Sequence, residues 1–375
     1  MTNFFFYGTL CHAPLLNEVL GREVPVESAV LPGHSVFWAK GKAFPLIVEG
    51  GAGALGVLVT GLTDRDVARL DFYEGGFAYQ TRLVSVAGQS GATEAHVYFP
   101  DAGRWQAGAP WRLADWVAQW GPTAVATAED FMRHLGVRAP AEVLARYPLM
   151  LMRGGAKARA RMPAPERILR DANGPQDVVV EKFAQTYANY FSVEEYDLRF
   201  RRFDGTMSEV VNRAVFLSGD ASVVLPYDPV RDRVLVIEQF RMGPFARGDV
   251  NPWLLEAVAG RVDGGETPEQ AARREALEEA GIVLQDLIPA RHYYPSPAAK
   301  GEYLYTYVGI ADLPDSVAGI GGLPGEAEDI RAHTLGFDKL MALVESGEVD
   351  SAPLIVLAYW LARQRAGLRG AAIGA

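Results

Sequence analysis

Carboxylates are concentrated in one segment of the sequence, GRVDGGETPEQAARREALEEAGI, which runs from residue 260 to residue 282. Hard divalent cations such as Mg²⁺ prefer oxygen ligands and also bind substrate phosphates, so such a cluster could hold a metal ion against a phosphorylated substrate. A guanidinium inside the cluster could orient a carboxylate by bidentate pairing. The alternative is an acidic helix face that is only solvated. The residues concerned are Glu266, Arg274, Glu275, Glu278 and Glu279.

The local sequence predicts the element that positions these side chains. Thr267 is a helix N-cap, Pro268 suits the first turn, and Gln270 completes a T-x-x-Q capping box. Gly281 suits the position just past the end of a helix. We therefore expect a helix over residues 267–280.

Three of the glutamates share one face of that helix, because Glu275, Glu278 and Glu279 are spaced i, i+3 and i+4. Like charges at this spacing repel by about 0.2–0.5 kcal/mol per pair. A cation at this face explains the clustering better than solvent does. Glu266 lies in the loop before the helix and could fold back onto the same face.

The whole pattern, G-x5-E-x7-R-E-U-x-E-E-x-G-U, resembles the Nudix box, with Ala276 in its first apolar position. The resemblance implies an α/β/α sandwich that hydrolyses nucleoside diphosphates linked to another moiety. It also implies divalent metal ions that polarise the pyrophosphate while an activated water attacks one phosphorus. By the same match, the metal ligands would be Glu275, Glu278 and Glu279, and Glu275, Glu279 and Arg274 would act in catalysis with support from Glu266.

Residues 221–361 resemble bacterial ADP-ribose pyrophosphatases in the words LPYDPVRDRVLVIEQFR, PWLLEAVAG, YPSP, GEAEDIRAH and VESGEVDSAPLIVLAYWLA. This resemblance implies hydrolysis of ADP-ribose to AMP and ribose 5-phosphate, with Mg²⁺ or alternatively Mn²⁺ as cofactor. It assigns Glu326 of a mobile loop as the catalytic base, and Glu328 and the carbonyl of Ala259 as further metal ligands. The substrate-binding residues by this match would be Arg213, Arg241, Pro297 and Glu302.

Two positions depart from that subfamily. Ala298 replaces the glycine that follows Ser-Pro, and Ala214 replaces the glutamate of an Arg-Glu pair on the adenine side. Another nucleoside diphosphate sugar or NADH is therefore an alternative substrate, and a nucleotide-binding regulator without turnover is an alternative function. Members of the subfamily are dimers with exchanged N-terminal strands, so the resemblance implies a homodimer in which residues near 205–217 contact the partner's site.

A second informative segment is FFFYGTL, which ends in a turn whose backbone N–H groups could bind an anion. Together with LDFYEGGFAYQ it resembles the gamma-glutamylcyclotransferase-like (AIG2-like) fold over residues 3–118. The resemblance implies that Tyr7, Gly8, Thr9 and Leu10 bind the glutamyl carboxylate. It also implies that Glu74 moves protons while the substrate amine attacks the γ-amide and closes 5-oxoproline. The alternative is a module that only binds a ligand or packs against a partner. The two-part layout is similar to that of tellurite-resistance proteins.

The composition limits the remaining function classes. The net charge of −10 argues against binding to a nucleic acid polymer or to an anionic membrane surface. Cys11 is the only cysteine, so no intrachain disulfide can form. The sequence has no signal-peptide pattern and no run of 18 apolar residues. We therefore expect a cytoplasmic protein that acts on a small molecule.

The length of 375 residues and the interleaved strand and helix patterns predict two domains of α/β (α+β) class. We expect a small β-rich gamma-glutamylcyclotransferase-like domain over 1–120 and a Nudix α/β/α sandwich over 178–367. Between them, residues 121–177 are predicted to be a helical and basic connector. Its basic stretch near 153–170 is interpreted as a solvated linker, with a phosphate-contacting arm as the alternative.

Overall fold

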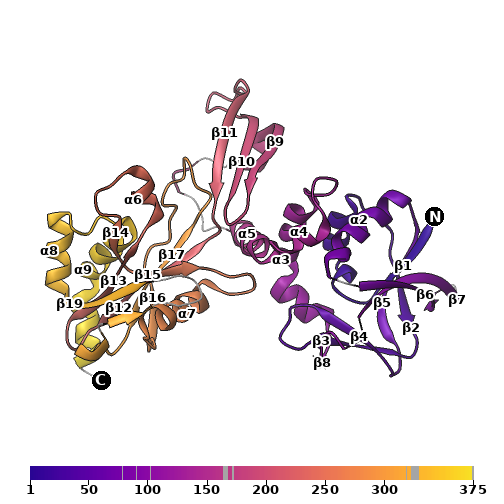
Figure 1. Ribbon diagram of the computed structural model, residues 1–375. Helices are drawn as coiled ribbons and strands as arrows, with labels where there is room; N and C mark the ends of the chain where they lie inside the picture. The colour runs from indigo at the N-terminus through magenta and orange to yellow at the C-terminus, as the bar shows by residue number, and fades with distance from the viewer. Residues whose placement is uncertain are drawn as a thin grey trace. The chain divides into compact units, whose positions relative to one another are not determined.

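The computed structural model describes residues 1–77, 79–89, 91–101, 103–163, 168–170, 173–317, 319–321 and 329–373. The chain folds as two compact units, Met1–Ala164 and Pro165–Ala375, which we call unit 1 and unit 2 (Figure 1). Each unit has hydrophobic cores of its own.

Unit 1 is built on a closed barrel with the strand order β1–β5–β2–β6–β7. Three successive phenylalanines of β1 are buried, because one side of the strand faces the barrel interior and the other side is covered by helices. A smaller sheet has the order β4–β3–β8. The strands are β1 (Thr2–Phe6), β2 (Glu27–Leu31), β3 (His34–Ala39), β4 (Pro45–Glu49), β5 (Ala54–Leu62), β6 (Tyr79–Gly88), β7 (Gly91–Pro100) and β8 (Ala107–Pro110).

Five α-helices accompany the barrel in the described part of unit 1. The second, α2, begins at a reciprocal capping box, in which Thr63 N donates to Asp66 Oδ2 at 2.9 Å and Asp66 N donates to Thr63 Oγ1 at 3.3 Å. This cap fixes where α2 starts, and the helix ends on Glu74. The helices are α1 (Ala13–Leu20), α2 (Asp64–Glu74), α3 (Leu113–Met132), α4 (Pro140–Leu144) and α5 (Tyr147–Ala160).

The helices α3 and α5 lie in the core of unit 1, which differs from the predicted connector over residues 121–177. Phe131 and Met150 are fully buried in the same cluster as barrel residues. The two helices approach closely at Gly154, where a Cβ would lie 2.2 Å from Thr127 Oγ1. The interpretation as a solvated linker is wrong for Arg153, which is 5% exposed. Basic composition suggested solvent exposure, but the helical period turns part of α5 inward.

The described residues of unit 2 form two sheets. A three-stranded antiparallel sheet consists of β9 (Val178–Ala188), β10 (Ser192–Phe200) and β11 (Val211–Leu217). The eight-stranded sheet has the order β16–β17–β12–β13–β19–β18, with β14 beside β13 and β15 beside β12. Only the pairing of β12 with β17 is parallel among its described ladders. Its strands are β12 (Ala221–Asp228), β13 (Arg233–Phe240), β14 (Trp253–Glu256), β15 (Val258–Arg261), β16 (Asp286–Pro289), β17 (Leu304–Ile310), β18 (Gly319–Gly321) and β19 (Ile330–Gly336).

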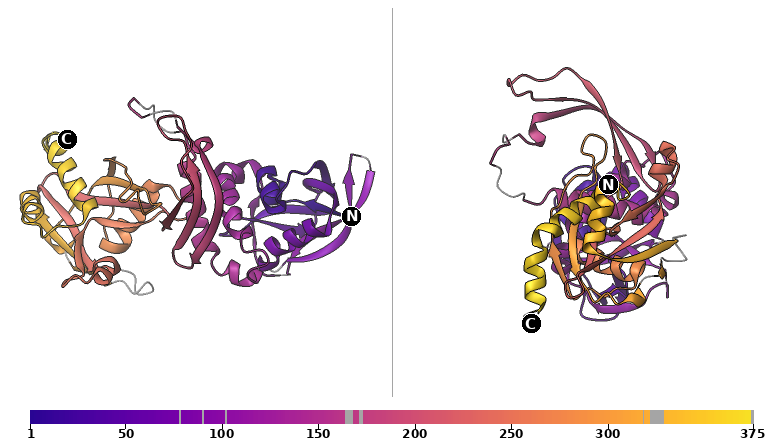
Figure 2. Two further views of the ribbon diagram at one scale, coloured as in Figure 1. Left: turned by 90° about the horizontal axis from the view of Figure 1, so that it is seen from above. Right: turned by 90° about the vertical axis from the view of Figure 1, so that its left-hand side faces the viewer.

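Helices cover both faces of the eight-stranded sheet (Figure 1). Successive side chains of a strand point to opposite faces, so Val223 packs with α8 (Phe337–Ser346) and α9 (Ala352–Ile373), whereas Val224 packs with α7 (Pro268–Ala280). The short helix α6 (Met242–Arg247) follows β13. The views in Figure 2 show α9 continuing past the sheet to the C-terminus. The α/β class, with a β-rich first part and an α/β/α sandwich in the second, is confirmed.

The helix that the sequence predicted over 267–280 is present, with Thr267 as its N-cap and Gly281 in the left-handed conformation after its end. The segment WLLEAV is divided between two strands, because β14 pairs with β13 whereas β15 pairs with β12. Among the described residues, none of the helices has the length and apolarity needed to cross a membrane.

Candidate active sites

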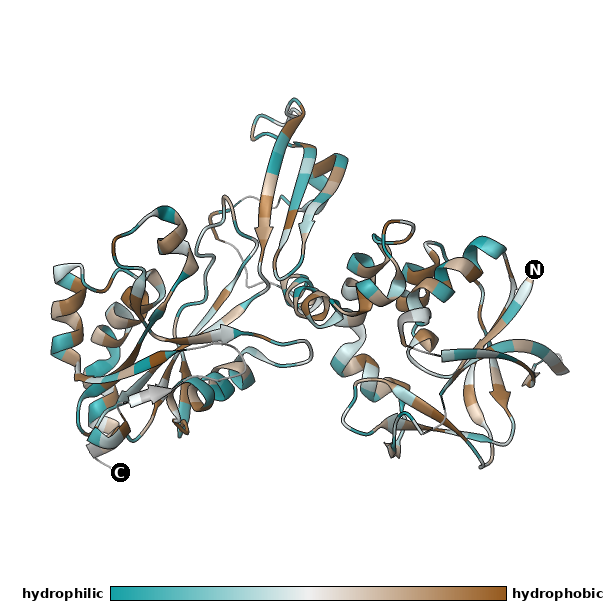
Figure 3. Cartoon of the chain, in the orientation of Figure 1, coloured by the Kyte–Doolittle hydropathy of each residue, from teal (hydrophilic) through white to brown (hydrophobic). Residues whose placement is uncertain are grey.

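The acidic face of α7 is organised around one guanidinium. Arg274 Nε and Nη2 donate to the two carboxylate oxygens of Glu266 at 3.0 and 3.1 Å. Arg274 Nη1 donates to Glu275 Oε1 at 2.6 Å and to Glu278 Oε2 at 2.9 Å. Nη2 also donates to the carbonyl of Arg261 at 3.0 Å, which ties the cluster to β15. The hydrophilic character of α7 is visible in Figure 3.

The protonation of this cluster follows from its contacts. Burial alone would lower the pKa of Arg274, but the hydrogen bonds to Glu266, Glu278 and Glu275 and the charge of Glu275 outweigh it and raise the pKa. The guanidinium is therefore a permanent positive charge that offsets the repulsion among the carboxylates.

The fourth carboxylate, Glu279, has a separate anchor. Its side chain is 3% exposed, and Oε2 accepts a hydrogen bond from the backbone N–H of Ala259 at 3.0 Å. The next residue, Gly260, leaves room for Glu275, because a Cβ at Gly260 would lie 1.9 Å from Glu275 Oε1. The strand β15 therefore contacts two of the glutamates of α7 directly.

The donor set of this face suits a hard divalent cation. Glu275, Glu278 and Glu279 offer carboxylate oxygens, and the carbonyl of Ala259 adjoins them on β15. Arg274 lies between Glu275 and Glu278 at hydrogen-bonding distance from both. Within the described ranges, no three His, Cys, Asp or Glu side chains are arranged as a metal-binding group. The roles of these residues as metal ligands stay predictions.

The predicted phosphate-contacting arginine, Arg241, directly follows β13. Its Nε donates to Glu256 Oε2 on β14 at 2.6 Å, and its backbone N–H donates to the carbonyl of Pro252 at 2.8 Å. Arg213 is exposed on β11 and donates from Nη1 to the carbonyl of Asn212 at 2.7 Å. These two arginines are positioned by different sheets.

Pro297 and Glu302 belong to a turn that is fastened to β11. The carbonyl of Ser296 accepts hydrogen bonds from Ala299 N at 3.1 Å and Lys300 N at 2.8 Å. Glu302 accepts from Ser218 Oγ at 2.8 Å and from Lys300 Nζ at 2.9 Å. Ala298 does not need a left-handed backbone here, because Asp232 is the only non-glycine residue with positive φ in the described part of the chain. The turn therefore forms without the subfamily's glycine.

A polar cavity of about 330 Å³ lies beside β13 and was not predicted from the sequence. Glu238 on β13 and Arg331 on β19 are directly opposite in the antiparallel register, and Glu238 Oε2 lies 2.9 Å from His333 Nε2. Only the pairing of strands far apart in the sequence brings these residues together. The lining residues are Glu238, Asn251, Trp253, Asp329 and Arg331. The two predicted loop glutamates, Glu326 and Glu328, lie outside the described residues.

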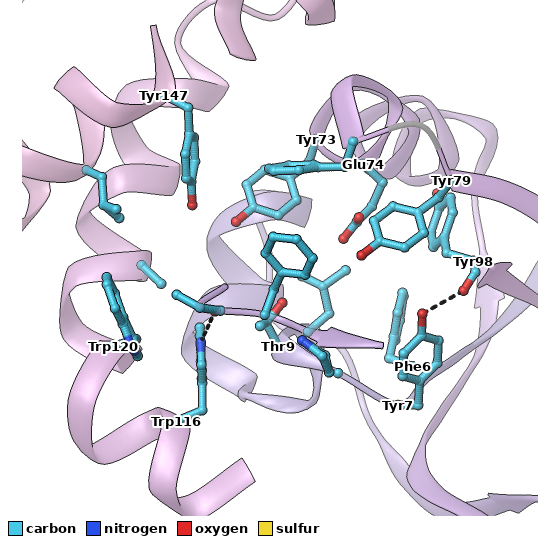
Figure 4. A pocket seen from close by; sticks show the side chains of 18 of the residues that line it. Phe6, Tyr7, Thr9, Tyr73, Glu74, Tyr79, Tyr98, Trp116, Trp120 and Tyr147 are labelled. Atoms are coloured by element: carbon cyan, nitrogen blue, oxygen red, sulfur yellow. Dashed lines mark hydrogen bonds between the residues drawn. The ribbon is translucent and has the colours of Figure 1, made fainter. Parts of the chain in front are cut away.

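Unit 1 encloses a second cavity, of about 120 Å³, to which the structure brings Glu74 and all four predicted turn residues (Figure 4). Glu74 is the last residue of α2, and burial raises the pKa of its carboxyl from 4.5 to about 7. Among the described residues, tyrosine hydroxyls interact electrostatically with this carboxyl. These are Tyr7, Tyr73, Tyr79, Tyr98 and Tyr147.

The turn after β1 forms one wall of this cavity. Gly8 has to be a glycine here, because a Cβ would lie 2.6 Å from Pro45 Cγ. Thr9–Cys11 form a single 3₁₀ turn, closed by a hydrogen bond from Cys11 N to the carbonyl of Gly8 at 3.0 Å. Tyr7 is held by its hydroxyl, which donates to the carbonyl of Tyr98 at 2.9 Å.

Comparisons with known proteins assign both halves of the chain. Residues 218–355 match the model for the NUDIX domain, and residues 4–118 match the model for gamma-glutamyl cyclotransferase, AIG2-like. The chain is 40% identical to the ADP-ribose pyrophosphatase of Escherichia coli (strain K12) over 188 residues, which are 50% of this chain and 89% of that protein. It therefore belongs to the Nudix family and is a Nudix hydrolase.

Two further relatives cover the same half. The ADP-ribose pyrophosphatase of Haemophilus influenzae is 33% identical over 188 residues, 50% of this chain and 86% of that protein. The GDP-mannose pyrophosphatase of Escherichia coli O1:K1 / APEC is 30% identical over 175 residues, 46% of this chain and 88% of that protein. The family is common to these relatives, whereas their named substrates differ.

We expect Gly260→Ala to impair catalysis much more than folding. The added Cβ displaces the end of the Glu275 side chain, which can move at little cost in stability, but a shift of about 1 Å at a reacting site costs about 100-fold in rate. The measurement is kcat for nucleoside diphosphate hydrolysis together with the thermal midpoint of unfolding. The control is Gly336→Ala, where nothing lies within 4 Å of the added carbon. Activity within threefold of wild type would show that the position of Glu275 is not critical.

We expect the charge of Glu74 to destabilise unit 1 as pH rises. The carboxyl is neutral in both states below pH 4.5, and between pH 4.5 and about 7 the unfolded state loses the proton first, so stability falls over this interval. A pKa difference of this size corresponds to about 3 kcal/mol. Glu74→Gln should therefore match wild type at pH 4 and exceed its stability at pH 8.

Urea unfolding followed by tryptophan fluorescence measures this difference, because Trp38, Trp105, Trp111, Trp116 and Trp120 of the chain's seven tryptophans lie in unit 1. Glu94→Gln, an exposed site on β7, serves as the control. A stability gain that is equal at pH 4 and pH 8 would contradict the raised pKa of Glu74.

Proposed function

We propose that unit 2 hydrolyses the pyrophosphate of ADP-ribose to AMP and ribose 5-phosphate in the presence of Mg²⁺, with Mn²⁺ as an alternative ion. The observation that carries this proposal is the convergence of Glu266, Glu275 and Glu278 on Arg274 at 2.6–3.1 Å, next to the anchored Glu279. The 40% identity to an ADP-ribose pyrophosphatase supports the choice of substrate.

Each residue of this proposed site has a separate role. Glu275, Glu278, Glu279, Glu328 and the Ala259 carbonyl would hold divalent ions, which when bound polarise the pyrophosphate and activate a water molecule. Arg274 orients Glu275 and Glu278 through its hydrogen bonds to their carboxylates. Glu326 is proposed as the base that takes a proton from the attacking water.

The substrate would be held by groups outside the acidic face. Arg241, fixed by Glu256, offers a cation to a phosphate, and the neighbouring Trp253 lines the polar cavity beside β13. Arg213 is proposed to contact the adenine side, and Pro297 and Glu302 to shape the turn that faces the substrate. Although Ala214 replaces the subfamily's glutamate, Glu195 lies directly opposite it on β10, so that face of the sheet still carries a carboxylate.

Another nucleoside diphosphate substrate is the main alternative, and the similarity to a GDP-mannose pyrophosphatase favours testing it. NADH is a further candidate, and a regulator that binds a nucleotide without turnover is the alternative outside enzymology. We also propose that the chain is cytoplasmic and forms a homodimer through β9–β11, where Val178, Val180 and Phe200 are 41–50% exposed. Sedimentation of the wild-type chain tests this, because a particle of one 40.8 kDa chain would exclude the dimer.

For unit 1 we propose gamma-glutamyl cyclotransferase activity, with a ligand-binding module as the alternative. The enclosed carboxyl of Glu74, whose pKa of about 7 suits a group that accepts and returns a proton near neutrality, supports this activity. The turn at Gly8 and Thr9 would hold the glutamyl carboxylate by backbone N–H groups.

A panel of ADP-ribose, GDP-mannose and NADH, with nucleoside monophosphate release as the readout, tests the function of unit 2. We expect the highest kcat/KM for ADP-ribose and a loss of at least about 100-fold in Glu279→Gln, because a carboxylate is removed while an oxygen remains to accept the hydrogen bond of Ala259 N. The matched control is Glu269→Gln, an exposed site on the same helix.

Each outcome of the panel separates the alternatives. If GDP-mannose or NADH leads, the proposed substrate is wrong while the hydrolase family is unaffected. If no compound is turned over with Mg²⁺ or Mn²⁺, and Glu279→Gln still binds nucleotide, the regulator is the correct function.

A further inference from the structure

Arg261, the last residue of β15, contacts two separate parts of unit 2. Its backbone carbonyl accepts a hydrogen bond from Arg274 Nη2 at 3.0 Å, at the acidic face of α7. Its side chain stacks on aromatic rings, with the guanidinium carbon 4.1 Å from the centre of the Tyr190 ring and 4.9 Å from that of Phe191. One residue therefore joins the acidic face to the three-stranded sheet.

The two rings belong to the tight turn between β9 and β10. A hydrogen bond from Asn189 N to the carbonyl of Phe191, at 2.9 Å, closes this turn. The rings of Tyr190 and Phe191 meet edge-on with their centres 4.8 Å apart. Because a guanidinium is planar and stacks on aromatic faces, the two rings determine where the Arg261 side chain lies.

The aromatic contacts continue to a turn that carries two of the predicted substrate-binding residues. Phe191 packs against Phe216 of β11, with ring centres 4.5 Å apart. The backbone of Phe216 in turn exchanges two hydrogen bonds of 2.9 Å with the segment 299–301. That segment lies between Pro297 and Glu302 in the chain. The same set of contacts therefore connects the acidic face with the turn proposed to face the substrate.

The carbonyl of Arg261 lies at the end of β15, whose pairing with β12 extends from Val258 to Arg261. Arg274 Nη2 donates both to this carbonyl and to Glu266 Oε2, at 3.0 and 3.1 Å. A displaced carbonyl would therefore turn the guanidinium of Arg274 and, with it, the carboxylates that it holds. The stacking of the Arg261 side chain gives the strand end a second attachment, which limits this displacement.

We propose that Arg261 is a positioning residue for the hydrolase reaction. The stack of its guanidinium on Tyr190 and Phe191 fixes its carbonyl, and the carbonyl fixes Arg274 and the carboxylates of α7. This inference rests on the proposed role of these carboxylates as metal ligands and adds the contact that holds them in place. It also means that a displacement of the three-stranded sheet would reach the acidic face through Arg261.

Arg261→Gln tests the stack, because it keeps the backbone carbonyl and an unbranched side chain but removes the charge that the rings attract. We expect the dissociation constant for Mn²⁺, measured by electron paramagnetic resonance on the substrate-free, full-length chain, to rise about tenfold. For the nucleoside diphosphate compound with the highest kcat/KM, kcat should fall about tenfold while KM at saturating metal stays within about threefold. The matched control is Arg199→Gln, an exposed arginine of β10 that pairs with Glu181, and it should change none of these values.

Two further single variants separate positioning from a general loss of structure. Arg261→Lys keeps a cation that can lie over the rings, so Mn²⁺ affinity and kcat should return to within about threefold of wild type. Tyr190→Leu removes a ring that is 56% exposed, which costs little buried area, and should reproduce part of the loss seen in Arg261→Gln. In the double variant the two losses should not add, because each single change breaks the same contact.

Glu279→Gln makes the outcomes distinguishable. If it abolishes Mn²⁺ binding and turnover while Arg261→Gln leaves both unchanged, the positioning role is overturned and the proposed metal-binding face stands. Losses that add fully in the double variant, or that follow a fall in the thermal midpoint of unfolding, would also overturn the positioning role. Retention of Mn²⁺ binding and turnover in Glu279→Gln would overturn the metal-binding face itself, and this inference with it.

Discussion

The charge of Arg274 is the interaction on which the hydrolase face of this protein depends. Without it, the carboxylates of Glu266, Glu275 and Glu278 would repel one another on one side of α7. The hydrogen bonds of its guanidinium hold all three within 2.6–3.1 Å and attach the helix to the carbonyl of Arg261. The cap at Thr267 fixes where α7 begins, and Gly281 fixes where it ends. Together they keep the acidic side of α7 next to β15.

The acidic face of α7 and the cavity beside Glu74 place carboxyl groups in opposite electrostatic surroundings. On α7 the carboxylates are paired with the guanidinium of Arg274, and these contacts raise the pKa of Arg274. In unit 1 burial raises the pKa of the Glu74 carboxyl to about 7, and none of the described residues that line its cavity is Lys, Arg or His. Metal ligands have to be deprotonated, whereas a group that transfers protons works best with a pKa near the working pH. The contrast supports two separate chemistries within one chain.

The sequence predicted those elements whose start and end are set by neighbouring residues. The capping box at Thr267 and the helix end at Gly281 carry their own signals, and both are present. Sequence analysis missed the features that depend on contacts between residues far apart in the chain. The inward side of α5 was hidden by its basic composition, because the partner of Arg153 is 23 residues away on another helix. The pairing of Glu238 with Arg331 likewise depends on strand register.

The placement of α3 and α5 bears on why the chain is longer than two matched domains. A flexible connector would only have to span a distance, and it would not need buried aromatic residues or a close approach at Gly154. The helices instead bury Phe131 and Met150 and close the cavity beside Glu74 with Trp120 and Tyr147. The packing that stabilises these two helices therefore also determines the shape of a binding site. Selection on ligand recognition in unit 1 would act on these helices as much as on the barrel.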